Sequence, residues 1–191
     1  MEMFLETERL ILRRFPEEDM DNHFELDSDP EVMRYLTGGK QTPRAVIRDE
    51  VLPGFLRDYE RFDGLGTWAV VEKSTGDFLG WFGLRPSKDD RGEVELGHRL
   101  RRSAWGKGYA TEGSRTLIQK GFTELDVQRV FAQTMAVNLS SRRVMEKSGL
   151  TFVRTFHLEW DEPVAGAGHG EVEYALTRAD WERRKEHRTG T

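Results

Sequence analysis

The residues with the clearest capacity for chemistry form a glycine-rich turn, Trp-Gly-Lys-Gly-Tyr-Ala, at positions 105–110. The turn follows an alternating, strand-like run at residues 93–100 and leads into a helix-like run from Thr111. Glycines let a backbone approach an anion without a Cβ in the way, and free N–H groups at a helix start point toward that anion. Four basic residues lie in or beside the turn: Arg99, Arg101, Arg102 and Lys107. This pattern predicts a phosphate-binding turn, and the alternative is a surface loop that only caps a helix.

Two familiar phosphate-binding motifs do not fit this turn. A nucleotide-triphosphate P-loop requires Ser or Thr after Gly-Lys, but Lys107 is followed by Gly108. A dinucleotide-binding fingerprint requires a third glycine where Thr111 stands, and it follows the first strand of a parallel βαβ unit. Here the preceding segment has the pattern of an antiparallel meander. The turn therefore predicts a diphosphate ligand bound in another fold.

Composition limits both the fold and the kind of function. With 191 residues and 37% hydrophobic content, the chain is expected to form a single domain over residues 1–191. It has no cysteine, which excludes disulfides, thiolate metal sites and a cysteine nucleophile. The five histidines include no His-x-x-x-His pair, so no metal site is predicted. A net charge of −5 argues against general nucleic-acid binding and favours cationic partners.

The sequence also gives an expectation about location. No run of residues approaches the apolar length that a membrane-spanning helix requires. Residues 1–6 lack the basic and then apolar layout of a signal peptide. We therefore expect a cytoplasmic protein with no membrane partner.

Hydrophobic periodicity predicts a mixed α/β fold. Residues 7–15 alternate like a strand, and helical segments are expected from Pro16, from Pro30 and from Thr42, with a possible site of bending at Pro53. From Gly66 onward the period changes to two, which predicts a three-stranded antiparallel meander leading into the glycine turn. The later elements are a helix with one buried stripe after the turn, a strand at 130–134, a helix from Asn138 to Gly149, strands at 151–160 and 171–177, and a last helix at 178–185.

Three motifs resemble one protein family. They are Glu-Leu-Gly-His at 95–98, Trp-Gly-Lys-Gly-Tyr-Ala-Thr-Glu at 105–112, and Asn-x-x-Ser-x-x-x-x-Glu-Lys-x-Gly at 138–149. Together with the order of elements they resemble the GNAT superfamily of acetyl-CoA-dependent N-acetyltransferases, in its RimJ/RimL-like branch. The resemblance runs from about Glu6 to Trp181. In the family signature Gly108 and Ala110 match, while Trp105 replaces a leading Gln or Arg.

The resemblance implies a fold and a cofactor site. The fold is a central, mostly antiparallel sheet that splays between the fourth and fifth strands, with helices on both faces. Acetyl-CoA would place its pantetheine arm in the splay and its diphosphate on the amides of the turn. The implied CoA-binding residues are Leu100, Arg101, Arg102, Trp105, Gly106, Lys107, Gly108, Tyr109, Ala110, Thr111, Asn138 and Ser141.

The resemblance also suggests an acid for the leaving thiolate. Many superfamily members place a tyrosine four residues beyond Ser141, but Met145 stands there and cannot donate a proton. In the branch that this chain resembles, the serine is proposed to take that role, so Ser141 is the candidate acid. The alternative is structural, because Asn138 is a favoured N-cap and Ser141 lies in the first turn of its helix.

A candidate base lies on the strand that enters the site. Glu93 and Glu95 share one strand face with Arg99, while His98 faces the other way. By family position Glu95 is the candidate, acting through a water molecule, with His98 in reserve. The alternative is an ordinary half-solvated strand with a carboxylate–arginine pair. A carboxylate near its reference pKa of about 4.3 removes a proton poorly, so either role needs an environment that raises basicity.

The acceptor is expected to be an amine that is easily deprotonated. At pH 7 an α-amino group with a pKa near 8 is about one-tenth neutral, whereas a lysine amine is almost entirely charged. This favours an N-terminal α-amine of a protein or peptide, or a small-molecule amine. The family's variable parts fall at residues 33–41 and 161–170, both implied to overhang the acceptor side. A monomer or homodimer is expected, and the rival function is a non-catalytic CoA-binding sensor or assembly module.

Overall fold

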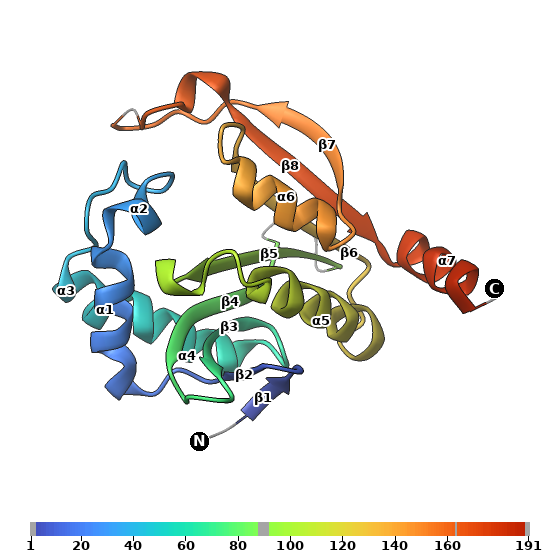
Figure 1. Ribbon diagram of the computed structural model, residues 1–191, viewed down its shortest axis with the longest axis horizontal. Helices are drawn as coiled ribbons and strands as arrows, with labels where there is room; N and C mark the ends of the chain where they lie inside the picture. The colour runs from blue at the N-terminus through green and yellow to red at the C-terminus, as the bar shows by residue number, and fades with distance from the viewer. Residues whose placement is uncertain (1–2, 88–91, 163, 190–191) are drawn as a thin grey trace.

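The computed structural model describes residues 3–87, 92–162 and 164–189. Its eight strands form one sheet in the order β1-β2-β3-β4-β5-β6-β8-β7 (Figure 1). Every neighbouring pair is antiparallel except β5 and β6, which are parallel. The strands are β1 (Met3–Glu6), β2 (Leu10–Arg13), β3 (Gly66–Glu72), β4 (Phe78–Pro86), β5 (Glu93–Leu100), β6 (Arg129–Met135), β7 (Thr151–Phe156) and β8 (Glu171–Thr177). The predicted mixed, mostly antiparallel sheet is confirmed.

Helices cover both faces of this sheet (Figure 1). They are α1 (Met20–Ser28), α2 (Pro30–Met33), α3 (Arg44–Val46), α4 (Leu52–Arg61), α5 (Tyr109–Glu124), α6 (Leu139–Lys147) and α7 (Arg178–Thr189). Between α3 and α4 lies a π-helical turn, Ile47–Val51, directly before Pro53. A proline lacks the N–H of a regular helical bond, so the irregularity occurs where a bend was expected.

Two apolar cores lie on the two faces. On one face, α5 and α6 pack against strand residues such as Phe82 and Leu84, and the α5 side chains Leu117, Ile118 and Phe122 are almost fully buried. This is the buried stripe that the spacing in α5 predicted. The other core is smaller, and it joins Trp81 and other sheet residues to α1 and the π-helical turn. The sheet therefore carries α5 and α6 on one side and α1 with the α3–α4 segment on the other.

The sheet opens between β5 and β6, the fourth and fifth of the predicted strands. These two strands pair in register only at Glu93–Glu95 against Arg129–Phe131. Beyond that point β5 stays with β4 as far as Leu100, and β6 stays with β8 as far as Met135. Strand β5 stays bonded to β4 and strand β6 to β8, so the C-terminal ends of β5 and β6 are free to separate. This opening confirms the predicted splay.

Several boundaries differ from those expected. The short edge strand β1 was not predicted, because four residues carry too little periodicity to identify a strand. Strand β7 ends at Phe156 rather than at residue 160, and α7 continues to Thr189 rather than ending at 185. In the loop between β4 and β5, residues 88–91 lie outside the described residues.

Gly113 brings α5 close to the sheet, and replacing it should be costly. A Cβ at this position would lie 2.4 Å from Cζ of Phe82, which is fully buried. We expect Gly113→Ala to lower the free energy of unfolding by about 1–3 kcal/mol, because overpacking forces side chains and backbone to shift. Urea unfolding measures this loss. The matched control is Gly54→Ala in α4, where a Cβ meets only the end of Arg57 at 3.8 Å; equal midpoints for the two variants would contradict the packing argument.

Candidate active site

The glycine turn forms an exposed anion cradle at the start of α5. Gly106 and Gly108 both have left-handed backbone conformations, with φ of 73° and 84°. Gly108 is the N-cap of the 16-residue helix α5 and provides no side-chain cap for the first turn. The first N–H groups of a helix have no intrahelical acceptor, and the helix dipole adds positive potential there. The backbone thus presents donors of the kind that phosphate groups bind, at the turn where the sequence places a diphosphate site.

A residue far away in the sequence secures this turn. The Arg9 guanidinium donates to the Lys107 carbonyl at 2.9 Å and pairs with Glu112 at 2.6 Å. Glu112 also accepts a hydrogen bond from the Thr7 hydroxyl at 2.6 Å. Burial alone would raise the pKa of Glu112, but the bonds from Thr7 and Arg9 lower it, so this first-turn acid stays ionised and paired. Arg9 therefore anchors the turn through its ion pair with Glu112 and its bond to Lys107, and no local sequence pattern indicated this role.

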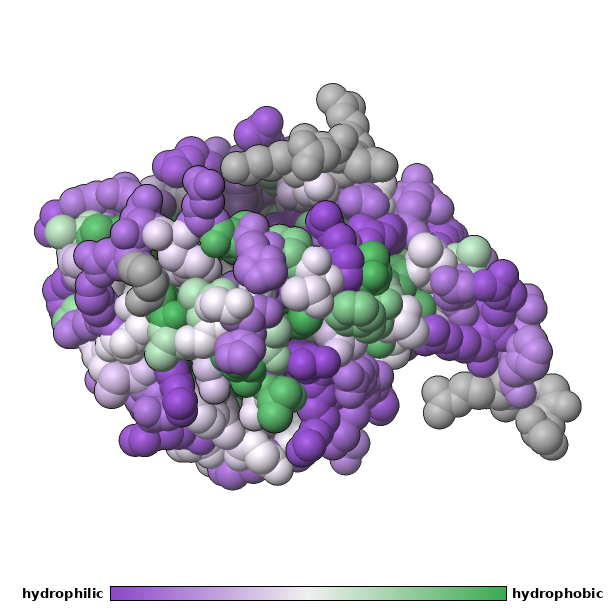
Figure 2. Space-filling view, turned by 90° about the horizontal axis from the view of Figure 1, so that it is seen from above, coloured by the Kyte–Doolittle hydropathy of each residue, from purple (hydrophilic) through white to green (hydrophobic). Residues whose placement is uncertain are grey.

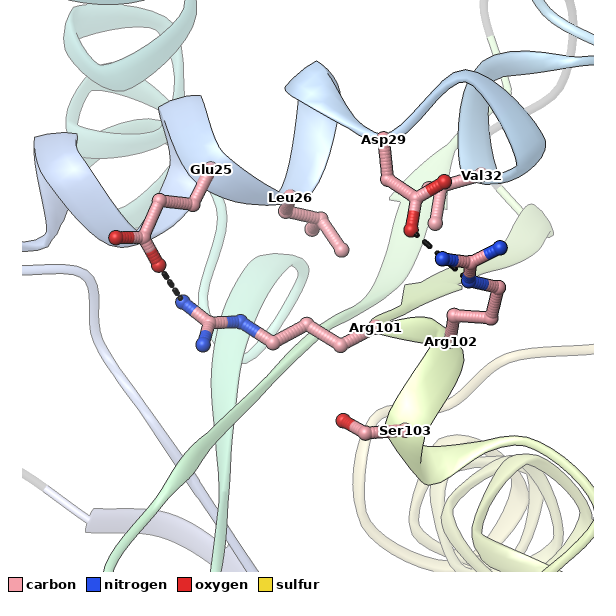
Figure 3. A pocket seen from close by; sticks show the side chains of 7 residues that line it. All are labelled: Glu25, Leu26, Asp29, Val32, Arg101, Arg102 and Ser103. Atoms are coloured by element: carbon pink, nitrogen blue, oxygen red, sulfur yellow. Dashed lines mark hydrogen bonds and ion pairs between the residues drawn. The ribbon is translucent and has the colours of Figure 1, made fainter.

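At the end of β5, the backbone and the side chains make different contacts. Leu100 is buried, and its carbonyl accepts a hydrogen bond from the indole N–H of Trp105 at 2.8 Å. The side chains of Arg101 and Arg102 point toward α1 and α2, where they pair with Glu25 at 2.8 Å and with Asp29 at 3.2 Å (Figure 3). Trp105 thus closes the turn, and the Arg101 backbone N–H donates to the Leu79 carbonyl of β4 at 2.7 Å.

These two ion pairs border a pocket of about 300 Å³ between α1, α2 and the end of β5 (Figure 3). Leu26 and Val32 give it an apolar wall, and Ser103 adds a hydroxyl. The volume is at the lower end of the range for small-molecule sites, about 300–1,000 Å³.

Asn138 and Ser141 lie at the start of α6, beyond the end of β6. The Asn138 side chain accepts from the Ser141 backbone N–H at 3.2 Å and donates to the Thr134 hydroxyl at 3.1 Å. The predicted N-cap is therefore present. Ser141 is half-buried, and its hydroxyl makes no bond to any described residue. Met145 stands where many superfamily members have a tyrosine. Its side chain is 5% exposed and packs in the larger core.

The two candidate bases lie on opposite faces of β5. Glu95 is half-exposed and pairs with Arg85 at 3.1 Å, so the carboxylate–arginine pair considered from the sequence is present. His98 faces α5, with its ring centroid 5.7 Å from that of Phe82. Burial lowers the pKa of His98 to about 4. At neutral pH His98 is uncharged and accepts a proton weakly.

Residues 9–151 match the family described as Acetyltransferase (GNAT) domain. The chain belongs to the GNAT family of acetyltransferases. A relative from Aspergillus fumigatus, named FsC-acetyl coenzyme A-N(2)-transacetylase, is 36% identical over 93% of this chain and 77% of its own length. An uncharacterized N-acetyltransferase, p20, from Bacillus licheniformis is 32% identical over 76% of this chain and 84% of its own length.

Solved structures share the GNAT fold. A GNAT acetyltransferase from Bacillus anthracis has a TM-score of 0.73 at 25% identity, covering 93% of this chain and 99% of its own. RimL, a ribosomal L7/L12 alpha-N-protein acetyltransferase in complex with coenzyme A, has a TM-score of 0.77 at 16% identity. The RimL alignment covers 92% of this chain and 98% of RimL. At this identity the likeness to RimL concerns the fold.

Two predicted absences concern metals and membranes. Within residues 3–87, 92–162 and 164–189, no group of three or more His, Cys, Asp or Glu side chains is placed to hold a metal ion. No helix in the same part of the GNAT chain is long and apolar enough to cross a membrane.

The two variable segments of this GNAT chain meet each other. An ion pair joins Lys40, before α3, to Glu162, in the connection between β7 and β8. A Cβ at Gly38 would lie 3.9 Å from the side chain of Val164, which is buried. Seen from above, apolar residues gather in the middle of the face and hydrophilic residues form its margin (Figure 2). The two segments expected to carry specificity, here together called the cover, are thus in contact at these positions.

A buried polar cluster fixes α1 to β5. Asp27 is 2% exposed and binds Arg99 of β5 at 2.5 Å, Thr42 at 2.7 Å and His23 at 3.6 Å. Burial alone would raise the pKa of Asp27, but the hydrogen bonds of His23 and Thr42 and the charge of Arg99 lower it to about 2. Asp27 joins three segments, α1, the loop before α3 and β5. It therefore sets the position of the helix that carries Glu25 and the pocket wall.

Proposed function

We propose that the protein transfers the acetyl group of acetyl-CoA to a primary amine by direct attack in a ternary complex. The observation that supports this most is the cradle of α5, a Gly108 N-cap with free first-turn amides and two nearby cations, placed beside the opening between β5 and β6. A diphosphate fits the cradle, and an extended arm fits between diverging strands. Family membership supports acetyl-CoA as the donor.

The residues proposed to hold CoA extend from the glycine turn to the opening between β5 and β6. The amides of residues 107–110 would bind the diphosphate, with Lys107 supplying positive charge and Arg9, which is paired with Glu112, holding the turn in place. The pantetheine arm would lie along the backbone of residues 100–102, with Asn138 on the other side of the opening. The ion-paired side chains of Arg101 and Arg102 leave only their backbone for this contact.

The chemistry requires one group to take a proton and another to give one. The amine lone pair forms the N–C bond at the thioester carbon, and backbone N–H groups near the end of β5 would stabilise the oxyanion. The C–S bond then breaks, and Ser141, whose hydroxyl is free to donate, protonates the sulfur. The amine proton passes to a carboxylate, for which Glu95 is the candidate from sequence, acting through a water molecule.

The acceptor proposed is an α-amine, on a protein or peptide N-terminus or on a small molecule. The name of the fungal relative specifies transfer to a nitrogen designated N(2), and that of RimL specifies an alpha-N position. The pocket beside the end of β5 adds Glu25 and Asp29, whose carboxylates would bind a cationic amine in exchange for their ion pairs with Arg101 and Arg102. The GNAT fold serves many acceptors, so the site residues rather than the fold support this choice.

Acetyl-CoA is expected to stabilise the protein. At a hundred times the dissociation constant, binding to the native state adds about 2.7 kcal/mol, which raises Tm by roughly 5–10 °C for a chain of this size. Thermal unfolding with and without acetyl-CoA checks this, and thiol release with a panel of peptides, amino acids, polyamines and amino sugars checks transfer. Stabilisation with no thiol release from any amine would favour the rival role of a CoA-binding sensor. No stabilisation at saturation would contradict the CoA site itself.

Ser141→Ala is expected to lower kcat about a hundredfold while leaving the CoA dissociation constant within twofold. The reason is that a general acid acts in the transition state, whereas the cap of α6 depends on the Ser141 backbone N–H. Steady-state kinetics and CoA titration measure both quantities. The neighbouring exposed serine supplies the control, Ser140→Ala; equal rates for the two variants would remove Ser141 from the mechanism.

A further inference from the structure

Glu171 and Glu173 lie on the same face of β8, but their hydrogen-bond partners differ. Glu173 accepts hydrogen bonds from Arg129, Arg154 and Gln133 at 2.7, 2.9 and 3.1 Å. Burial alone would raise the pKa of Glu173, but these bonds bring it below its ordinary value. Glu171 is also only 5% exposed, but its Oε1 has no partner among the described residues, and burial raises its pKa. A buried carboxylate oxygen without a hydrogen-bond partner is costly, which makes Glu171 a candidate for binding or catalysis.

The register places Glu171 at the open end of the gap between β5 and β6. It pairs with Met135, the last residue of β6. The Asn138 backbone N–H donates to the Met135 carbonyl at 2.9 Å, and the Ala136 N–H donates to the Gly170 carbonyl at 2.9 Å. The start of α6, which holds the candidate acid, is therefore built on the same strand end as Glu171.

Glu171 and the candidate acid Ser141 lie on opposite faces of the sheet. Glu95 pairs with Phe131, and Met135 lies four residues further along the same strand, so Glu171 and Glu95 share one face. Helix α6 covers the opposite face. Glu95 lies at the closed end of the gap, where β5 and β6 still pair, and it is bound to Arg85. Glu171 lies at the open end, and its Oε1 receives no hydrogen bond from the part of the chain that the structure describes.

We propose that Glu171 is the catalytic base that takes the proton from the acceptor amine, an inference that rests on the proposed acetyl transfer. Glu171 takes one proton from the ammonium form of the acceptor, which frees the nitrogen lone pair. The lone pair forms the N–C bond, the C–S bond breaks and the sulfur takes a proton from Ser141, while the second proton of the nitrogen restores the Ser141 hydroxyl. The attacking nitrogen and the leaving sulfur occupy different sides of the carbonyl carbon. A base on one sheet face and an acid on the other meet this requirement.

None of the described residues forms an ion pair with Glu171. Glu173 and Arg154 are bound to each other across β7 and β8. His169 lies two residues before Glu171, and the His157 ring approaches Gly170, where a Cβ would lie 3.1 Å from its Nε2. From the cover, Glu162 is bound to Lys40. A cationic amine that enters beneath this cover would supply the charge that the carboxylate lacks.

The test compares Glu171→Gln with the wild-type enzyme, using acetyl-CoA and whichever amine of the panel gives the highest wild-type rate. We expect kcat to fall about a hundredfold at pH 6.5, with the deficit shrinking toward pH 9 as more of the amine is already neutral. The CoA dissociation constant should stay within twofold. Glu171→Asp, which keeps a carboxylate, should recover part of the rate. Glu60→Gln, at an exposed position of α4, is the matched control and should match the wild type.

Stability provides a second readout that shows whether the variant folds. A carboxyl group whose folded-state pKa is raised stabilises the fold fully only below its unfolded pKa, and this contribution is lost as pH rises through the folded value. Glu171→Gln should therefore have a Tm equal to or above that of the wild type at pH 8. A properly folded Gln variant with wild-type kcat at pH 6.5, or one with only a raised KM, would overturn the proposal.

Glu95→Gln separates the two candidate bases. A hundredfold, pH-dependent loss of kcat in Glu95→Gln together with wild-type kcat in Glu171→Gln would assign the role to Glu95 and overturn the inference while leaving acetyl transfer intact. Absence of thiol release by the wild-type protein over the whole panel would contradict the proposed function itself. The two failures are therefore distinguishable.

Discussion

Replacing Asp27 with asparagine is expected to lower the free energy of unfolding by about 3–5 kcal/mol at pH 7, the range for removing one partner of a buried ion pair. Asp27 is 2% exposed, and Arg99, its partner on β5, is largely covered. Asparagine keeps the shape but leaves the Arg99 charge without its counterion. It also weakens the link from Thr42, so α1 and the loop before α3 lose a common anchor. Chemical denaturation followed by circular dichroism measures the loss.

The chain offers a matched control on the same helix. Asp21 pairs with Arg44 at 2.5 Å, but its side chain is 72% exposed. Exposed ion pairs contribute about 0–1 kcal/mol, so Asp21→Asn should be nearly neutral. If Asp27→Asn were no more destabilising than Asp21→Asn, the buried cluster would have no role in holding α1 on the sheet.

The same cluster predicts a pH dependence. The pKa of Asp27 is lowered from 3.8 to about 2, so the unfolded state binds more protons between these two values. The contribution of Asp27 is complete above pH 4 and is lost as the pH falls toward 2. A shift of this size corresponds to about 2.5 kcal/mol. The difference in stability between wild type and Asp27→Asn should therefore narrow over this acidic range, as urea midpoints at several pH values would show.

Local patterns were enough to predict most of the fold. Alternation identified the strands around the turn, the spacing in α5 identified its buried stripe, and Asn138 and Gly149 marked the ends of α6. Each of these signals is contained within a few consecutive residues. Strand β1 lacked such a signal, since its four residues are stabilised by pairing with β2 rather than by their own propensity.

The site was less predictable because much of it is assembled by tertiary contacts. The turn at 105–110 could be found from its glycines, but its clamp by Arg9 joins residues 103 positions apart. Likewise, the contrast between Glu171 and Glu173 depends on which of them faces Arg129 and Arg154. In sequence the two glutamates are equivalent members of an alternating strand. The register between β6, β7 and β8 brings Arg129, Gln133 and Arg154 to Glu173. It brings no described hydrogen-bond donor to Oε1 of Glu171.

Gly108→Val is expected to weaken CoA binding about a hundredfold or more. Gly108 has φ of 84°, a conformation that a β-branched residue adopts only with strain, and its Cβ would approach the Arg9 guanidinium at 3.4 Å. Relaxing this strain turns the first amides of α5 away from the diphosphate. Hydrogen bonds to charged groups contribute about 1.5–3 kcal/mol each, so misdirecting two of them accounts for the loss. Calorimetric titration with CoA measures it directly.

Two further variants test this explanation against a general disturbance of the loop. Gly106 is also left-handed, with φ of 73°, but a Cβ there would meet no atom within 4 Å, so Gly106→Ala should weaken CoA binding much less than Gly108→Val. Lys107→Met keeps the backbone and removes one exposed cation, which should raise the CoA dissociation constant several-fold and reduce its dependence on salt. Near-wild-type affinity in a folded Gly108→Val variant would mean that the diphosphate does not bind at the start of α5. Strong loss in Gly106→Ala alone would instead shift the cradle toward the middle of the turn.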